Sequence, residues 1–211
     1  MLAPKTTLLK NKASGTTEKG LERVHAILEA ARQIVATEGY AGLSMRKVAA
    51  QLGMSLSNLQ HYYPEKDLLI EAVLQMTMNH FQEKIDQISA SMQHQSRLER
   101  LTSTIDMFLE ELSDPLTYGL FFEIWAMAGR HPFASDLMDK MISREKKTIY
   151  KLIAGMNPAI SDQEYQIRSA LIVAQVEGLM LFRFHRKSQR GEAGRVYDAV
   201  RGQILKLATL P

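Results

Sequence analysis

The sequence contains no cysteine among its 211 residues. This absence excludes a disulfide framework, a thiolate metal site and a cysteine nucleophile. Long apolar runs are also missing, because the most apolar stretch, residues 170–182, is interrupted by Gln175 and Glu177. No segment is therefore predicted to span a membrane, and the N-terminus lacks an apolar stretch of signal-peptide length. The cytoplasm is the simplest compartment that fits these absences.

Sequence motifs typical of enzymes are absent as well. The chain has no G-x-G-x-x-G, no G-x-x-x-x-G-K-[ST], no G-x-S-x-G and no H-E-x-x-H. None of its six histidines has another histidine four positions along, so no helix presents two imidazole ligands on one face. We therefore predict no metal site, no cofactor and no enzymatic activity.

The charge is nearly balanced overall, with a formal net charge of +3, but it is unevenly distributed. Residues 1–66 carry nine basic and five acidic side chains, whereas residues 67–211 carry 17 and 18. An excess of positive charge at one end weakly indicates a polyanionic partner for that end, although charge alone favours a solvated tail. Hydrophobic residues at 45% and charged residues at 23% are typical of a folded protein.

Apolar residues recur at helical spacing along the chain, and no alternating run predicts a strand, so the fold class is all-α. A first helix begins at about residue 21, and Gly39 is expected to end it. Two short helices follow, with Ser44 and Ser55 as their N-caps. Pro64 ends the second of these, and a long fourth helix begins at about residue 65. The remaining helices are predicted at about 97–113, 115–130, 134–155, 161–186 and 191–208.

The two short helices have the pattern of a helix-turn-helix, in which the second short helix enters the major groove of DNA. The apolar positions that lock them together are Val48, Ala49, Leu52, Leu56 and Leu59. The positions left outward are Arg46, Lys47, Ser55, Ser57, Asn58, Gln60 and His61. Short polar and basic groups of this kind suit base edges and phosphates. The pattern alone also fits other small three-helix units.

Residues 21 to about 70 resemble the DNA-binding domain of the tetracycline-repressor (TetR) family of transcriptional regulators. The family has a first helix ending in a phrase such as ATEGYAGLSM, followed by a VA…LG-V-S…L-Y-H-Y-F-P-x-K run. The matching segments here are Val35–Tyr40 (VATEGY), Val48-Ala49, Leu52–Ser55 (LGMS) and Leu59–Lys66 (LQHYYPEK). Two departures bear on which bases are read: Gln60 replaces a frequent tyrosine, and Ser57-Asn58 replaces a common glycine-threonine pair.

The resemblance implies a role in DNA binding for each matching position. Ser44, Tyr62, Tyr63 and Lys66 are expected to meet the phosphate backbone, with packing in the core as the alternative for Tyr63. The expected groove contacts are made by Arg46, Leu56, Ser57, Asn58, Gln60 and His61, and Ser55 is a further expected DNA-binding residue. Arg46 can read guanine and Gln60 can read adenine if they reach the bases. Lysines of the N-terminal arm either enter the minor groove or remain solvated.

The C-terminal helices carry aromatic and methionine side chains, and the resemblance implies a cavity for a small-molecule effector among them. The predicted effector-binding residues are Phe108, Tyr118, Phe121, Phe122, Trp125, Met141, Gln175 and Glu177. Trp125 is expected to share a helix face with Phe121. An ordinary helix-bundle core explains the same side chains. Glu123 and Glu177 lie on otherwise apolar helices, where each needs a ligand or a partner such as Arg168 or Arg183.

Small residues four positions apart on the helix from about 161 predict close approach of another helix, either in a second copy or within one protomer. The expected dimer interface consists of Ala170, Ala174, Gly178, Val196, Val200 and Ile204. The resemblance favours the dimer, in which two helices of each subunit form a four-helix bundle.

Four regions follow: a flexible basic arm (1–20), a helix-turn-helix domain (21–66), a connecting long helix and boundary (67–96), and an effector-binding and dimerisation domain (97–211). The resemblance implies a homodimeric regulator, more readily a repressor than an activator, that leaves a palindromic double-stranded DNA operator when the effector binds. The fourth helix would transmit the change. The alternative is an architectural DNA-binding protein whose C-terminal domain only dimerises.

Overall fold

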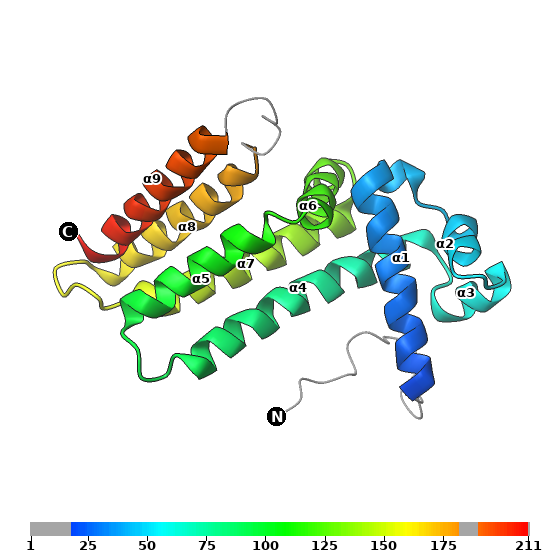
Figure 1. Cartoon of the computed structure of the whole chain (residues 1–211), viewed down its shortest axis with the longest axis horizontal. Coiled ribbons are helices and arrows are strands. Elements are labelled where there is room, and N and C mark those ends of the chain that lie inside the picture. The colour runs from blue at the N-terminus through cyan, green and yellow to red at the C-terminus, as the bar shows by residue number, and fades with distance from the viewer. Residues whose placement is uncertain (1–17, 182–189, 211) are drawn as a thin grey trace. The chain divides into compact units, whose positions relative to one another are not determined.

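The computed structural model describes residues 18–181 and 190–210, and all the regular elements of this part of the chain are helices (Figure 1). They are α1 (Glu18–Gly42), α2 (Met45–Gln51), α3 (Leu56–Tyr62), α4 (Lys66–Ser91), α5 (Arg97–Glu111), α6 (Pro115–Ala128), α7 (Pro132–Ile153), α8 (Asp162–Leu179) and α9 (Arg190–Thr209). The predicted all-α class is confirmed. Most of the predicted arm and the predicted partner Arg183 lie outside the described residues.

Local side-chain chemistry explains where the helices begin. The hydroxyl oxygens of Ser44 and Ser55 accept hydrogen bonds from the third residue into α2 and α3, each at 3.2 Å. Both predicted N-caps are therefore confirmed. Ser96 forms a capping box with Glu99, whose pKa is lowered by hydrogen bonds from the Ser96 hydroxyl and backbone N–H. Gly39 has a φ of 74° and interrupts the helical backbone of α1, although one more turn follows it.

The helices form two compact units that do not follow the chain order. Of the described residues, unit 1 comprises 18–81 and 115–137, and unit 2 comprises 82–114, 138–181 and 190–210. This division differs from the expected one, in which everything from residue 97 onward formed one domain. The physical reason is that α6 packs against α1 and so belongs with the helix-turn-helix.

In unit 1, α6 approaches the backbone of α1 closely (Figure 1). A Cβ atom placed on Gly119 would lie 2.5 Å from the carbonyl oxygen of Ala36, so only glycine fits there. One turn further along α6, the Glu123 carboxylate accepts a hydrogen bond of 2.9 Å from the backbone N–H of Tyr40. Glu123 therefore has a backbone partner on α1, rather than the ligand or arginine considered from the sequence.

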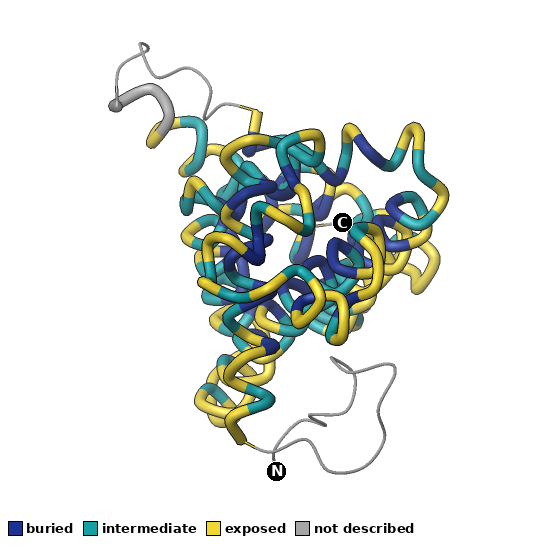
Figure 2. The backbone as a smooth tube through the Cα atoms, turned by 90° about the vertical axis from the view of Figure 1, so that its right-hand side faces the viewer, coloured by how far each residue is buried: buried dark blue, intermediate teal, exposed yellow. Residues whose placement is uncertain are grey.

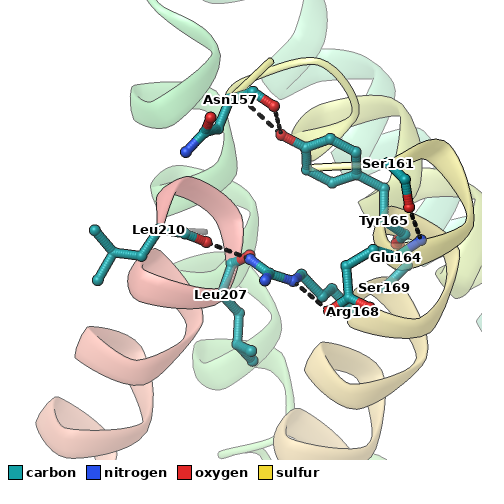
Figure 3. A network of polar contacts seen from close by, with 8 residues as sticks. All are labelled: Asn157, Ser161, Glu164, Tyr165, Arg168, Ser169, Leu207 and Leu210. Atoms are coloured by element: carbon teal, nitrogen blue, oxygen red, sulfur yellow. Dashed lines mark hydrogen bonds and ion pairs between the residues drawn. The ribbon is translucent and has the colours of Figure 1, made fainter. Parts of the chain in front are cut away.

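In unit 2, α8 and α9 run antiparallel side by side, and a polar network joins their ends to the turn after α7 (Figure 3). Arg168 forms an ion pair of 2.8 Å with Glu164 and donates to the carbonyl oxygens of Leu207 and Leu210 at the end of α9. A cation at this position satisfies carbonyls that have no partner within the helix. The hydroxyl of Tyr165 accepts from the backbone N–H of Asn157 at 2.7 Å.

Buried, half-buried and exposed positions succeed one another along the helices, as amphipathic packing requires (Figure 2). The largest completely buried side chains of unit 1 include Ile27, Leu28, Leu59, Leu69 and Leu120. Those of unit 2 include Leu101, Ile105, Ile153 and Tyr165. Each unit therefore has its own hydrophobic core.

Candidate nucleic-acid interface and effector recess

Helices α2 and α3 lie next to each other and are joined by a tight turn (Figure 1). Gly53 in this turn has a φ of 60°, a conformation that favours glycine, and the N–H of Met54 donates to the carbonyl of Ala49 at 2.9 Å. Val48 and Leu59 are completely buried between the helices and their neighbours. This arrangement confirms the predicted helix-turn-helix.

The structure brings most of the predicted DNA-contacting residues to the surface of one helical motif. The exposed ones are Ser44, Arg46, Ser55, Ser57, Asn58, Gln60 and His61. Leu56 and Tyr62 are half-buried, and the ring of Tyr62 packs edge-on against that of His61 at 5.9 Å. The outward side of α3 is therefore polar and accessible, whereas its inward side is held by Leu59.

Tyr63 is placed in the core, which corrects the expected phosphate contact and agrees with the packing alternative. The residue is 7% exposed, and its hydroxyl has no hydrogen-bond partner. Burial raises the pKa of this phenol to about 12. The sequence could not separate the two roles, because Tyr63 directly follows α3 and a tyrosine there has both an apolar ring and a polar end.

Lys66 is half-buried and engages Tyr40. Its ammonium group donates to the Tyr40 carbonyl oxygen at 2.6 Å and lies 3.7 Å from the centre of the Tyr40 ring. Burial lowers the pKa of Lys66, while the neighbouring Asp67 opposes the shift. The Tyr40 hydroxyl also bonds to Asp67. These contacts join the end of α1 to the start of α4, a structural role that the sequence pattern did not indicate.

We expect the variant Lys66→Met to lower the free energy of unfolding by about 1–2 kcal/mol, because it removes a charge-assisted hydrogen bond and a cation–π contact. Thermal unfolding of the two purified proteins measures this difference. An unchanged stability together with a uniform loss of affinity for all DNA sequences would contradict the structural role and support the phosphate contact.

The predicted effector-binding residues do not form one cluster. Phe121 is 3% exposed and packs on Phe81 at 5.7 Å between ring centres, within unit 1. Trp125 packs edge-on against Phe122, with 5.5 Å between the ring centres. Tyr118 also packs against Phe122, so these three side chains of α6 form an aromatic row in unit 1.

The other four predicted effector residues belong to unit 2, and two of them line a recess between α5, α7 and α8. The volume of this recess is about 260 Å³ when its open mouth is included. Its lining residues are Ile105, Phe108, Glu145, Ile149, Ile172, Val173, Val176 and Glu177. Met141 is buried and Gln175 is half-buried, but neither of them lines it. Glu145 was not predicted, because it lies in the charged run Arg144–Lys147.

Glu145 and Glu177 face each other across this recess. Burial raises the pKa of Glu177 to about 7. Burial, repulsion from the Glu177 carboxylate and a hydrogen bond to it raise the pKa of Glu145. One oxygen of Glu177, Oε2, is shielded from solvent and has no hydrogen-bond partner. Neither Arg168 nor any other basic side chain of the described chain lines the recess.

We expect the wild-type protein to lose stability as the pH rises from about 4.5 to about 7, the ordinary and the raised pKa of Glu177. In this range the folded state binds more protons than the unfolded state, so each increment of pH favours unfolding. Glu177→Gln cannot ionise and should show a smaller decline. Thermal unfolding of both proteins at pH 5 and pH 8 provides the comparison, and equal declines would contradict the assignment.

The predicted interface residues occupy different environments in the protomer. Ala174 is exposed, Ala170 and Gly178 are half-buried, and no described atom lies within 4 Å of a Cβ placed on Gly178. Val196 and Val200 are half-buried, whereas Ile204 is 1% exposed and packs within its own protomer. Two other apolar residues of α8, Ile167 and Leu171, were not predicted as interface residues, although they are 50% and 47% exposed.

Membrane-spanning helices and metal-binding clusters are both absent from residues 18–181 and 190–210. No helix in these ranges combines the length and apolar character needed to cross a membrane. No group of three or more His, Asp or Glu side chains in the same ranges is arranged to hold a metal ion.

Residues 27–73 match the family model described as bacterial regulatory proteins, tetR family. The chain is 28% identical over 162 residues to an HTH-type transcriptional regulator in the dhlA 5′ region of Xanthobacter autotrophicus, a match that covers 74% of this chain and 77% of that protein. The matched model segment contains the whole of α2 and α3.

Solved structures show the same fold along most of the chain. A TetR transcription regulator from Haloarcula marismortui superposes with a TM-score of 0.72 at 16% identity, covering 89% of this chain and 96% of that one. A transcriptional regulator from Saccharomonospora viridis, solved in complex with choline, gives a TM-score of 0.67 at 21% identity, covering 87% and 93%. Residues 27–73 are therefore matched to the tetR family of bacterial regulatory proteins, and most of the chain shares the fold of these two regulators.

Proposed function

We propose that the protein is a homodimeric, cytoplasmic repressor that binds a palindromic DNA operator and releases it when a small-molecule effector binds. The observation that carries the DNA-binding part is the exposed polar surface of α3, held in a helix-turn-helix by two serine caps and a buried Leu59. A short helix with this surface fits the major groove.

The exposed residues divide into two groups by the chemistry of their side chains. Arg46 has the donors that a guanine edge accepts, and Gln60 has both the donor and the acceptor that pair with an adenine edge; both side chains are exposed. Ser44, Ser57 and Asn58 carry short polar groups that suit phosphate oxygens or nearby bases. Tyr63 is left out of the proposed contact surface because it is buried.

The proposed dimer uses the outer face of α8. Ile167, Leu171, Ala174 and Gly178 follow one another at spacings of four, three and four residues, so they lie on one face of the helix. Large exposed apolar side chains next to small residues provide both the driving force and the room for a second helix. Val196 and Val200 of α9 extend the proposed interface, whereas the buried Ile204 supports it from within.

The effector is proposed to bind in the recess of unit 2. This recess has apolar walls and two convergent polar groups, the composition typical of small-molecule sites. The choline complex of the Saccharomonospora viridis regulator shows that a protein of this fold holds a small molecule. We propose that α4, which has residues in both units, transmits the effect of ligand binding to the helix-turn-helix.

The test uses the duplex that the full-length protein enriches from a pool of random sequences. Gln60→Ala should weaken binding to that duplex by about 1–3 kcal/mol, while binding to scrambled DNA stays unchanged, because a base contact carries the sequence preference. Affinity should fall steeply with added salt, since phosphates are neutralised. Fluorescence anisotropy measures both effects.

Gln87→Ala is the matched control, because Gln87 is an exposed glutamine of α4 outside the helix-turn-helix. It should leave both affinities unchanged. An equal loss on specific and scrambled DNA for Gln60→Ala would remove Gln60 from the reading role. A protein that binds all duplexes equally would be an architectural DNA-binding protein rather than a repressor.

A further inference from the structure

Among the residues that the structure describes, no basic side chain lines the recess to compensate the pair formed by Glu145 and Glu177. Glu145 comes from α7 and Glu177 from α8, and both lie among apolar side chains. The apolar lining consists of Ile105, Phe108, Ile149, Ile172, Val173 and Val176. Two ionised carboxylates in such surroundings repel each other and lose their hydration. They therefore destabilise the fold unless a proton or a cation compensates their charge.

The charge and hydrogen bonding of the Glu145–Glu177 pair indicate which kind of ligand would complete the site. Burial raises the pKa of Glu177 to about 7 and, together with repulsion from Glu177, raises that of Glu145, so above about pH 7 Glu177 ionises and the pair carries a negative charge. Glu177 Oε2 is cut off from solvent and accepts no hydrogen bond from residues 18–181 or 190–210. A buried acceptor without a partner is costly, and costly polar groups that a fold retains are concentrated at functional sites.

We propose that this recess binds an organic ammonium cation, with the Glu145–Glu177 pair holding the charged nitrogen and the apolar wall holding an attached hydrocarbon group. The proposal rests on the proposed function, because it names the chemical class of the effector. An N–H of the ammonium group donates to Glu177 Oε2, and the positive charge compensates the negative charge of the pair. A neutral ligand supplies no charge, and an anion is repelled.

The recess is too small in this conformation to hold a hydrocarbon group. Its unfilled interior has room for about one water molecule, so a hydrocarbon group enters only if α5, α7 and α8 move apart. Binding therefore favours a conformation different from the unliganded one, which is the requirement for an effector that changes DNA affinity. Isoleucine and valine side chains form most of the wall, which suits a short alkyl group.

The test compares three probes of equal length on the full-length protein without DNA: n-hexylammonium, 1-hexanol and hexanoate. Isothermal titration calorimetry at pH 7.5 should show that n-hexylammonium binds at least about thirtyfold more tightly than 1-hexanol, because its ionic hydrogen bond is buried. Hexanoate should not bind. Equal affinity for the amine and the alcohol, or no binding by the amine, would overturn the proposal.

Two variants locate the site. Glu177→Gln keeps the shape of the side chain and should reduce the preference for the amine to about threefold or less, since the negative charge is gone. Asp139→Asn is the matched control, because Asp139 is an exposed acid on α7 and the variant removes the same charge. It should leave the preference intact. A preference that survives Glu177→Gln would overturn the assignment, and thermal unfolding verifies that each variant is folded.

Operator binding distinguishes this inference from the function on which it rests. If n-hexylammonium binds through Glu177 and also weakens operator binding in wild type but not in Glu177→Gln, both ideas are supported. If it binds through Glu177 and leaves operator affinity unchanged, the cation site stands and the effector role fails. If the chain reads no DNA sequence, the proposed function fails while the calorimetric comparison still decides the cation site.

Discussion

Leu171→Glu is expected to convert the proposed dimer into monomers and to reduce operator affinity by at least about a hundredfold. Leu171 is 47% exposed in the protomer and lies at the centre of the apolar face of α8. A carboxylate there would have to be buried against the same face of a second copy, where it meets its own counterpart across the symmetric interface. A palindromic site is held by two recognition helices, so a monomer loses half of the contacts.

Analytical ultracentrifugation measures the oligomeric state, and fluorescence anisotropy measures operator affinity, on the same preparation. Ile142→Glu is the matched control, because Ile142 is an exposed apolar residue of α7 in the same unit, outside the proposed interface. It should remain dimeric and bind the operator normally. A dimer that persists in Leu171→Glu with unchanged helicity would place the interface on another surface.

Gly119→Ala is expected to destabilise the protein by about 2–3 kcal/mol, although alanine is the better helix former. The added methyl group would lie 2.5 Å from the carbonyl oxygen of Ala36, and backbone cannot move aside as the end of a side chain can. The strain should separate α6 from α1 and weaken the nearby hydrogen bond between Glu123 and Tyr40. Thermal and denaturant unfolding measure the loss.

Gly194→Ala provides the opposite control. Gly194 is an exposed residue of α9, and no described atom lies within 4 Å of an added Cβ. This variant should therefore gain up to about 1 kcal/mol from helix propensity. A Gly119→Ala protein as stable as the wild type would show that α6 does not approach α1 as closely as the structure indicates.

The helix boundaries near the DNA-binding motif could be predicted because short-range chemistry determines them. Ser44 and Ser55 accept the hydrogen bonds expected of N-caps, and Gly39 and Gly53 take the positive φ angles that end a helical segment. These features depend on residues within one turn. They are therefore visible in a single sequence.

The division into units could not be predicted, because it depends on which helices meet across a long stretch of chain. Only the absence of a side chain at Gly119 lets α6 meet α1, and a glycine in a helical sequence does not reveal which other helix it faces. The same limit applies to Trp125, whose ring packs against that of Phe122, three positions away. Neighbours three and four positions away are both within reach on a helix, and packing decides how the rings meet.

Only one of the two acidic residues of the recess, Glu177, could be predicted from the sequence. Glu177 stands out because it interrupts an apolar helix, whereas Glu145 lies between Arg144 and Lys146 and has the pattern of a solvated surface. Its burial results from the packing of α7 against the rest of unit 2, a long-range effect. Lys66 is a similar case, because its bond to the Tyr40 carbonyl joins residues 26 positions apart.

The most direct test of the proposed repressor is to select DNA from a random pool with the full-length protein and to determine how many protomers bind the enriched duplex. A dimeric repressor should enrich an inverted repeat whose half-sites lie about one helical turn, or a multiple of it, apart, with an even number of protomers bound. Enrichment of no particular sequence, or a single protomer on an asymmetric site, would contradict it.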